Sequence, residues 1–143
     1  MVYLIRHTTP AIEAGVCYGR SDLALADTAP REIDAVLEAI PDITIVYSSP
    51  AQRCLRLAQA VAAAQGIDHQ TDPRLQEIDF GDWEGRRWDD IPVADIARWD
   101  AQLWDHTPGG GESLRDLWQR VAEFSDDVLR PFAEAVDRHA LVV

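Results

Sequence analysis

Residues 43–66 read ITIVYSSPAQRCLRLAQAVAAAQG, and this stretch decides the fold class. Its apolar, β-branched beginning predicts a buried strand over residues 43–47. Ser49 and the proline after it are typical of a helix N-terminus, with serine as the cap and proline in the first helical position. We expect that helix to run through Ala64, because Gly66 then ends the pattern. A strand that leads straight into a helix is the repeating unit of parallel α/β sheets.

The alternation of strands and helices continues on both sides of this unit. Short apolar runs predict buried strands over residues 2–5 and 140–143 and an edge strand over residues 67–71. Apolar residues at helical spacing predict a helix that Pro41 closes and a long helix that Ser113 caps. Strands that alternate with helices favour a parallel sheet with helices packed on it.

The composition excludes several classes of function. The chain has 143 residues, the size of one domain, and a net charge of −12 from 25 acidic and 13 basic residues. Such an acidic chain is a poor binder of nucleic acid, because phosphate backbones attract basic proteins. All 13 basic residues are arginine, so a Walker A loop, a pyridoxal Schiff base and a lysine nucleophile are excluded.

Neither a membrane span nor a signal peptide is predicted. No apolar stretch is long enough to cross a bilayer, and the N-terminal apolar run meets a charge already at Arg6. The two cysteines, Cys17 and Cys54, lack the spacing of a redox motif or a zinc site. We therefore expect reduced thiols in a cytoplasmic protein.

The residues that follow the predicted strands carry the chemistry. Arg6 and His7 follow the strand over residues 2–5, and Arg53 lies one turn into the helix that follows residues 43–47. Ligands of parallel sheets bind at the carboxyl ends of the strands. Two guanidinium groups, an imidazole and a helix N-terminus at one edge predict a site for an oxyanion such as phosphate.

Five motifs occur in the order found in one enzyme family. They are LIRHTT (residues 4–9), GRSDLAL (19–25), SSPAQR (48–53), LQEIDFGDWEG (75–85) and PGGGES (108–113). In these motifs the chain resembles the histidine phosphatase (phosphoglycerate-mutase-like) superfamily. The resemblance implies a three-layer α/β/α sandwich with a mostly parallel sheet, formed by a single domain over residues 1–143.

Two of these regions point to a subfamily. RHTTP at residues 6–10 and CYGRSD at residues 17–22 are most similar to α-ribazole phosphatases. Those enzymes remove phosphate from α-ribazole 5′-phosphate in the assembly of the cobalamin nucleotide loop. The resemblance thus implies a small phosphorylated metabolite as partner, with no metal and no cofactor. A phosphoglycerate mutase-type phosphotransfer and a non-catalytic relative that only binds a phosphate ligand stay open as alternatives.

The resemblance also implies roles for individual residues. His7 attacks phosphorus as a neutral imidazole and forms a phosphohistidine, which water then hydrolyses. Arg6 and Arg53 neutralise the phosphoryl oxygens, and their charge favours the neutral imidazole. Glu77 protonates the leaving alkoxide, and Glu84 is the competing carboxylate for that role.

Thr8 and Arg20 are candidate substrate-binding residues. Thr8 stands next to the nucleophile where the family has glycine, and Arg20 is either a substrate-loop residue or a charge in a turn. Glu13 stands where many members have a phosphate-binding asparagine, a role that an ionised carboxylate cannot take. Trp99 and Trp104 are candidates for stacking on an aromatic substrate base, although tryptophans are more often core or lid residues.

One residue of the family pattern is not found in the sequence. The superfamily has a second catalytic histidine in a loop directly after a late strand, and here the strand over residues 140–143 ends the sequence. His69, His106 and His139 do not match that position. We therefore expect the sequence to be a histidine phosphatase cut off just before its second histidine, with the C-terminal part of the fold missing.

Overall fold

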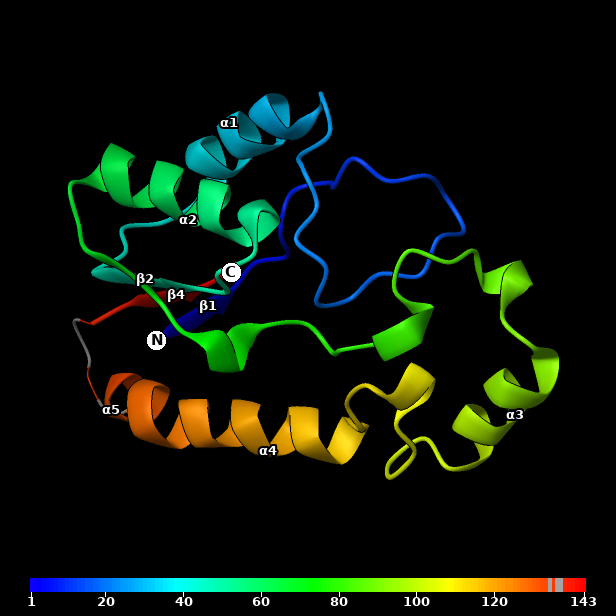
Figure 1. The fold of residues 1–143 in the computed structure, drawn as a ribbon. Coiled ribbons are helices and arrows are strands. Elements are labelled where there is room, and N and C mark those ends of the chain that lie inside the picture. Colours follow the sequence, from blue (N-terminus) through cyan, green and yellow to red (C-terminus); the bar gives the residue numbers. More distant parts are fainter. Residues whose placement is uncertain (134, 136–137) are drawn as a thin grey trace.

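The computed structural model describes residues 1–133, 135 and 138–143, and in them the centre of the fold is a sheet of four parallel strands. The strands are β1 (Val2–Leu4), β2 (Ile45–Ser48), β3 (His69–Thr71) and β4 (Ala140–Val142). Their order across the sheet is β1-β4-β2-β3, with β3 at an edge as predicted. Strand β4, from the end of the chain, therefore lies between β1 and β2 (Figure 1).

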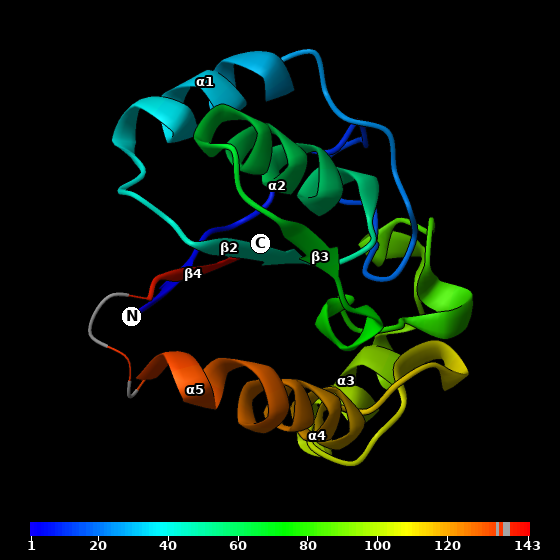
Figure 2. The ribbon, with the colours of Figure 1, turned by 90° about the vertical axis from the view of Figure 1, so that its left-hand side faces the viewer.

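Helices cover both faces of the sheet (Figure 2). Helices α1 (Ala29–Ala39) and α2 (Gln52–Gln65) lie on one face, and α4 (Leu114–Phe124) and the short α5 (Arg130–Ala133) lie on the other. A π-helical stretch over Ser125–Leu129 joins α4 to α5. The prediction of a three-layer α/β/α sandwich with a parallel sheet is therefore confirmed.

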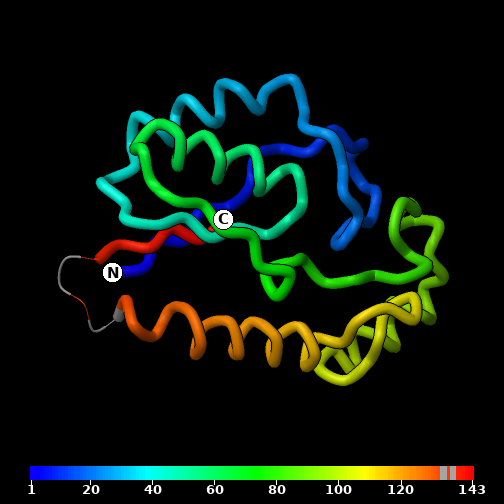
Figure 3. The backbone as a smooth tube through the Cα atoms, turned by 60° about the vertical axis from the view of Figure 1, so that its left-hand side comes forward, coloured from blue at the N-terminus to red at the C-terminus, as the bar shows by residue number. Residues whose placement is uncertain are grey.

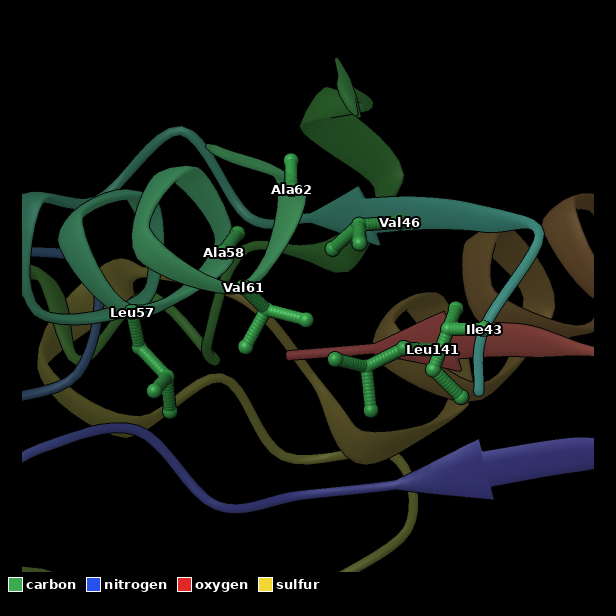
Figure 4. Packing of buried hydrophobic residues seen from close by; sticks show 7 residues of the cluster. All are labelled: Ile43, Val46, Leu57, Ala58, Val61, Ala62 and Leu141. Atoms are coloured by element: carbon green, nitrogen blue, oxygen red, sulfur yellow. The ribbon is translucent and has the colours of Figure 1, made fainter. Parts of the chain in front are cut away.

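The core between the sheet and α2 is aliphatic (Figure 4). Val46 of β2 and Leu141 of β4 pack with Leu57 and Val61 of α2, and each of these side chains is at most 1% exposed. Full burial of such a side chain contributes about 1.5–3 kcal/mol. This layer therefore holds α2 firmly against the sheet, and with it Arg53 in the first turn of the helix.

The opposite face of the sheet is held by aromatic side chains. Tyr47 of β2 meets Phe124 and Phe132 edge to face, at ring-centroid distances of 5.7 and 6.3 Å.

Helix α4 begins with a capping box, in which the side chains of Ser113 and Asp116 each accept a hydrogen bond from the other's backbone N–H. The helix start predicted at Ser113 is confirmed.

One predicted helix boundary is wrong. Helix α2 begins at Gln52 with Ala51 as its N-cap, two residues later than predicted. The reason is that the backbone still runs with the sheet at Ser49, whose N–H donates to the Val143 carbonyl. The predicted end of the helix at Gly66 is confirmed, and this residue adopts the left-handed conformation that ends many helices.

The segments outside the sandwich gather past the carboxyl ends of the strands (Figure 3). The loop after β1 and the residues between β3 and α4, which include α3 (Val93–Ala101), leave the sheet on that side.

Cys17 in the loop after β1 and Cys54 in α2 are buried, unbridged thiols. In the described part of the chain, no helix has both the length and the apolar character needed to cross a membrane.

Candidate active site

Three ionisable side chains border two hollows at the carboxyl ends of the strands. Arg6 and His7 follow β1, and Glu77 lies in the segment after β3. All three line a first hollow of about 370 Å³ and a second hollow of about 250 Å³, and Arg53 of α2 lines the second. The structure therefore brings together the four residues that the sequence nominates as nucleophile, phosphate-binding and proton-transfer groups.

The imidazole of His7 is oriented by its neighbour in the chain. Its Nδ1 lies 2.7 Å from the carbonyl oxygen of Thr8. A carbonyl only accepts hydrogen bonds, so Nδ1 carries the proton and Nε2 keeps a lone pair. Burial lowers the pKa of His7, and the charges of Arg53 and Arg6 act in the same direction, against the Thr8 bond and Glu77. Together these effects favour the neutral form of the imidazole, which is the nucleophilic one.

The lowered pKa of His7 predicts an activity that persists into mild acid. Because the neutral imidazole is the attacking form, kcat/KM falls only when the pH drops below the ordinary histidine pKa of 6.5. We expect the NMR titration of the His7 ring to have its midpoint below 6.5, and the acid limb of kcat/KM to follow it. A midpoint above 6.5 would mean that Glu77 and the Thr8 bond outweigh burial and the two arginines.

Arg53 is buried and fixes the loop over residues 19–21. Its guanidinium donates to the carbonyl oxygens of Gly19 and Ser21 and lies over the Tyr18 ring, 5.5 Å from the ring centroid. The residue is 2% exposed, yet its Nε has no hydrogen-bond partner in the described part of the chain. Arg53 thus places a permanent positive charge beside the second hollow.

The N-terminus of α2 is already occupied by a carboxylate. The Gln52 N–H donates to Asp22 at 2.7 Å, and the Gln52 side-chain amide adds a second bond at 3.3 Å. Asp22 therefore neutralises part of the positive end of the helix dipole, which the sequence assigns to an oxyanion. The positive charge available to a phosphate comes from Arg53 and from Arg6, whose side chain is exposed.

Thr8 connects the loop after β1 to α2. Its hydroxyl donates to the Arg53 carbonyl at 3.1 Å, and its backbone N–H donates to the same oxygen at 3.3 Å. Thr8 is 2% exposed and lines neither hollow. The structure therefore does not bring Thr8 into the substrate space. Its side chain instead sets the spacing between His7 and Arg53.

The two candidate carboxylates have different surroundings. Glu77 is exposed, lines both hollows and accepts a hydrogen bond from the Ile78 N–H. Glu84 accepts bonds from the Ser21 hydroxyl and from the backbone N–H groups of Gly19, Arg20, Ser21 and Phe80. Burial alone would raise the pKa of Glu84, but these bonds outweigh it and hold the pKa below its usual range. Glu84 is therefore a fixed anion that organises a loop, which leaves Glu77 for proton transfer.

Comparison with known proteins identifies the family. The profile of the histidine phosphatase superfamily (branch 1) matches residues 2–143. The chain belongs to the histidine phosphatase superfamily. The family expected from the five motifs is therefore confirmed.

Relatives of this superfamily member include proteins named as mutases. The probable phosphoglycerate mutase GpmB of Erwinia tasmaniensis is 33% identical over 135 residues, which are 90% of this chain and 62% of the relative. GpmB of Proteus mirabilis is 35% identical over 127 residues, which are 84% of this chain and 59% of the relative. The chain thus spans about three fifths of the length of these curated relatives, whose name is not that of an α-ribazole phosphatase.

Solved structures with the same fold include one that is named as a phosphatase. YhfR of Bacillus stearothermophilus superimposes with a TM-score of 0.80 at 27% identity, over 99% of this chain and 72% of that one. The mycobacterial glucosyl-3-phosphoglycerate phosphatase, solved with VO3, gives a TM-score of 0.79 at 26% identity, over 98% of this chain and 72% of that one. These likenesses support the α/β fold of this histidine phosphatase superfamily member.

Arg20 belongs to a charged network and lines neither hollow. It lies 3.4 Å from Asp79 and 3.3 Å from Glu112. Glu112 also accepts two hydrogen bonds from Arg120, at 2.7 and 2.8 Å, and Arg120 donates to the Glu77 carbonyl at 3.2 Å. The network therefore ties the backbone that carries Glu77 to α4. Sequence reasoning missed Glu112, although it lies in the PGGGES motif.

We expect Glu112→Ala to destabilise the histidine phosphatase fold strongly. Burial alone would raise the pKa of Glu112, but Arg120 and Arg20 hold it below its usual range, and its side chain is only 12% exposed. Removing the carboxylate takes the ionic partner from the Arg120 guanidinium, whose side chain is 16% exposed, and one of two carboxylate partners from Arg20, which costs about 3 kcal/mol. Urea unfolding measures the loss. The control Glu123→Ala, on an exposed position of α4, changes the free energy of unfolding by less than about 0.5 kcal/mol.

The remaining candidates lie away from the hollows. Glu13 is 85% exposed and pairs with Arg87 at 3.5 Å. The His69 Nε2 lies 2.9 Å from the Ser48 hydroxyl. The His139 Nδ1 donates a hydrogen bond of 3.0 Å to the backbone carbonyl of Asp42. Among the described residues, no three His, Cys, Asp or Glu side chains are grouped so as to hold a metal ion.

Proposed function

We propose that this protein is a metal-independent phosphomonoesterase that works through a phosphohistidine at His7. The observation that carries the proposal is a neutral imidazole with its Nε2 lone pair available, beside two arginines and an exposed carboxylate at the same two hollows. The substrate is a small phosphorylated metabolite of the cytoplasm. The RHTTP and CYGRSD motifs support α-ribazole 5′-phosphate as that metabolite.

The first half of the reaction forms the phosphoenzyme. The lone pair of His7 Nε2 attacks phosphorus in line with the ester oxygen, so a P–N bond forms as the P–O bond breaks. Arg6 and Arg53 stabilise the charge on the equatorial oxygens. The leaving alkoxide takes a proton from the carboxyl group of Glu77, and the alcohol departs.

The second half of the reaction returns the enzyme to its starting state. Glu77 is now a carboxylate and accepts a proton from a water molecule, whose oxygen attacks the phosphohistidine. The P–N bond breaks, inorganic phosphate leaves, and the electron pair returns to Nε2 of His7. The bond between Nδ1 and Thr8 stays in place throughout, since it involves the other ring nitrogen.

A chelator test measures the proposed function directly. We expect hydrolysis of p-nitrophenyl phosphate to proceed at the same rate in excess EDTA as without it, because arginines do the work that a metal does in other phosphoryl transfers. Addition of Mg²⁺ after EDTA should leave the rate unchanged. Activity that is lost in EDTA and restored by a divalent metal would contradict the proposal.

The names of the curated relatives favour a second candidate, phosphoglycerate mutase-type phosphotransfer. The two functions differ in the molecule that accepts the phosphoryl group from the phosphohistidine. A phosphatase gives its phosphoryl group to water and releases inorganic phosphate, whereas a mutase returns it to a second hydroxyl of a phosphoglycerate. Incubation with 3-phosphoglycerate, and separately with α-ribazole 5′-phosphate, followed by assays for inorganic phosphate and for the isomeric ester, separates the two. Binding of either ester without turnover would indicate the non-catalytic alternative.

A further inference from the structure

The first hollow has a charged end and an apolar wall. The charged end consists of Arg6, His7 and Glu77. The other lining residues are uncharged and mostly aromatic or aliphatic, namely Val16, Tyr18, Ile78, Phe80 and Trp88. A phosphate at the charged end leaves the rest of its ester against this wall. The wall therefore bears on the identity of the alcohol part of the substrate.

The aromatic part of the wall is held rigid from behind. The Trp88 ring is stacked on Trp99, with an angle of 11° between the planes and 6.3 Å between the centroids. Phe80 meets both rings edge to face, at 5.6 and 5.8 Å. Trp83 and Ile91 are buried in the same cluster. Trp88 thus presents a preformed aromatic surface, and binding a ligand there orders few side chains.

The tryptophans that the sequence nominates for stacking are not the ones that face the substrate space. Trp99 packs against Trp88 and lines neither hollow. Trp104 is 42% exposed and lies against Trp118, with the Arg115 guanidinium over its ring. The structure therefore does not bring Trp99 or Trp104 to the hollows, and the packing of Trp99 in a buried cluster agrees with the expectation that tryptophans are mostly core or lid residues.

The first hollow offers little to a second anionic group. Arg6 is the arginine among its lining residues. Arg53 lines the second hollow and not the first, and Arg20 is paired with Asp79 and Glu112. A carboxylate or second phosphate on the substrate would lie against the uncharged wall, where no second arginine among the described residues lines the hollow to pair with it. The lining therefore favours one phosphate on an otherwise uncharged molecule.

We infer that the substrate is a phosphomonoester whose alcohol part carries a planar, uncharged, apolar group that lies against Trp88. The inference rests on the proposed function, because it takes Arg6 and His7 as the phosphate site. Trp88 is then a specificity-determining residue. It favours aromatic esters over small alkyl esters and over phosphoglycerates, in which a carboxylate occupies the same space.

The test uses phosphonates, which occupy a phosphate site without being hydrolysed. Isothermal titration calorimetry of the 143-residue chain compares phenylphosphonate, methylphosphonate and phosphonoacetate. We expect phenylphosphonate to bind about 10-fold more tightly than methylphosphonate, as one stacked ring does elsewhere. Phosphonoacetate should bind no more tightly than methylphosphonate. Trp88→Ala should remove the preference for the phenyl group and leave methylphosphonate affinity within about twofold.

Two further variants keep the test decisive. Trp104→Ala removes an exposed tryptophan away from the hollow and should change none of the three affinities. Val16→Asp places a negative charge in the wall and should also remove the phenyl preference, so it replaces Trp88→Ala if circular dichroism shows that variant unfolded. Equal affinity for phenyl- and methylphosphonate, or tighter binding of phosphonoacetate, would overturn the inference while leaving the phosphatase proposal intact. Tight, Trp88-dependent binding of phenylphosphonate without turnover of any ester would support the inference and contradict the phosphatase proposal.

Discussion

His7→Ala is expected to lower the rate of p-nitrophenyl phosphate hydrolysis by about 10⁴-fold, because the variant lacks the imidazole nitrogen that forms the covalent intermediate in the proposed reaction. Arg6 and Arg53 still bind the phosphate, so KM should change much less than kcat. The variant should fold normally, since the Nδ1 bond of His7 goes to the adjacent carbonyl of Thr8 and holds no distant part of the chain.

Two measurements accompany the rate. Mass spectrometry of protein quenched at alkaline pH during turnover should find the phosphoryl group on the peptide that contains His7, and should find none in His7→Ala. The matched control is His139→Ala, which removes an imidazole that precedes β4 at the opposite end of the sheet. Its rate should stay within about twofold of the parent. A phosphoryl group on any other residue, or equal losses in both variants, would contradict the assignment.

The sequence predicts which candidate side chains lie together, because their positions follow from the topology. Arg6 and His7 come directly after one strand, and Arg53 lies in the first turn after another. The carboxyl ends of parallel strands meet at one edge, so the fold class alone brings these side chains together. Their proximity can therefore be predicted without knowing any individual side-chain contact.

The hydrogen bonds and ion pairs that hold the site together are not predicted from the sequence, because they join residues far apart in the chain. The guanidinium of Arg53 meets the Gly19 carbonyl 34 residues away, and Arg20 meets Glu112 across 92 residues. Which of these groups lines a hollow and which supports it depends on side-chain directions that no local pattern encodes. Arg20 and Thr8 therefore share the motifs of the site residues, yet the structure gives them supporting contacts.

The same limit explains the two carboxylates. Glu77 and Glu84 lie in one motif, seven residues apart, and their residue type is identical. Their environments separate them: Glu84 accepts four backbone N–H groups and a hydroxyl, whereas Glu77 faces both hollows. A carboxylate with so many donors is held in its charged form and is a poor proton donor. The choice of general acid is thus made by hydrogen-bond geometry.

Glu77→Gln is expected to reduce hydrolysis of alkyl phosphates by about 10²–10³-fold, because a glutamine cannot protonate the leaving alkoxide. The loss should be smaller in the release of p-nitrophenol from p-nitrophenyl phosphate, since p-nitrophenolate leaves readily without a proton. The ratio of the two losses is the informative quantity. Stopped-flow measurement of the first turnover, with a phenyl phosphate series of increasing leaving-group pKa, provides it. Glu13→Gln, at an exposed carboxylate paired with Arg87, is the matched control and should leave the series unchanged.

The second half of the reaction makes the Glu77→Gln test sharper. Water attack on the phosphohistidine needs the Glu77 carboxylate as a base. With p-nitrophenyl phosphate the variant should therefore release a burst of p-nitrophenol and then turn over slowly, with phosphorylated His7 accumulating. In the proposed reaction Glu77 is the acid in the first step and, as a carboxylate, the base in the second step. The single substitution must therefore slow both steps. An equal loss for good and poor leaving groups, with no burst, would instead mean that Glu77 holds the substrate and that another group moves the proton.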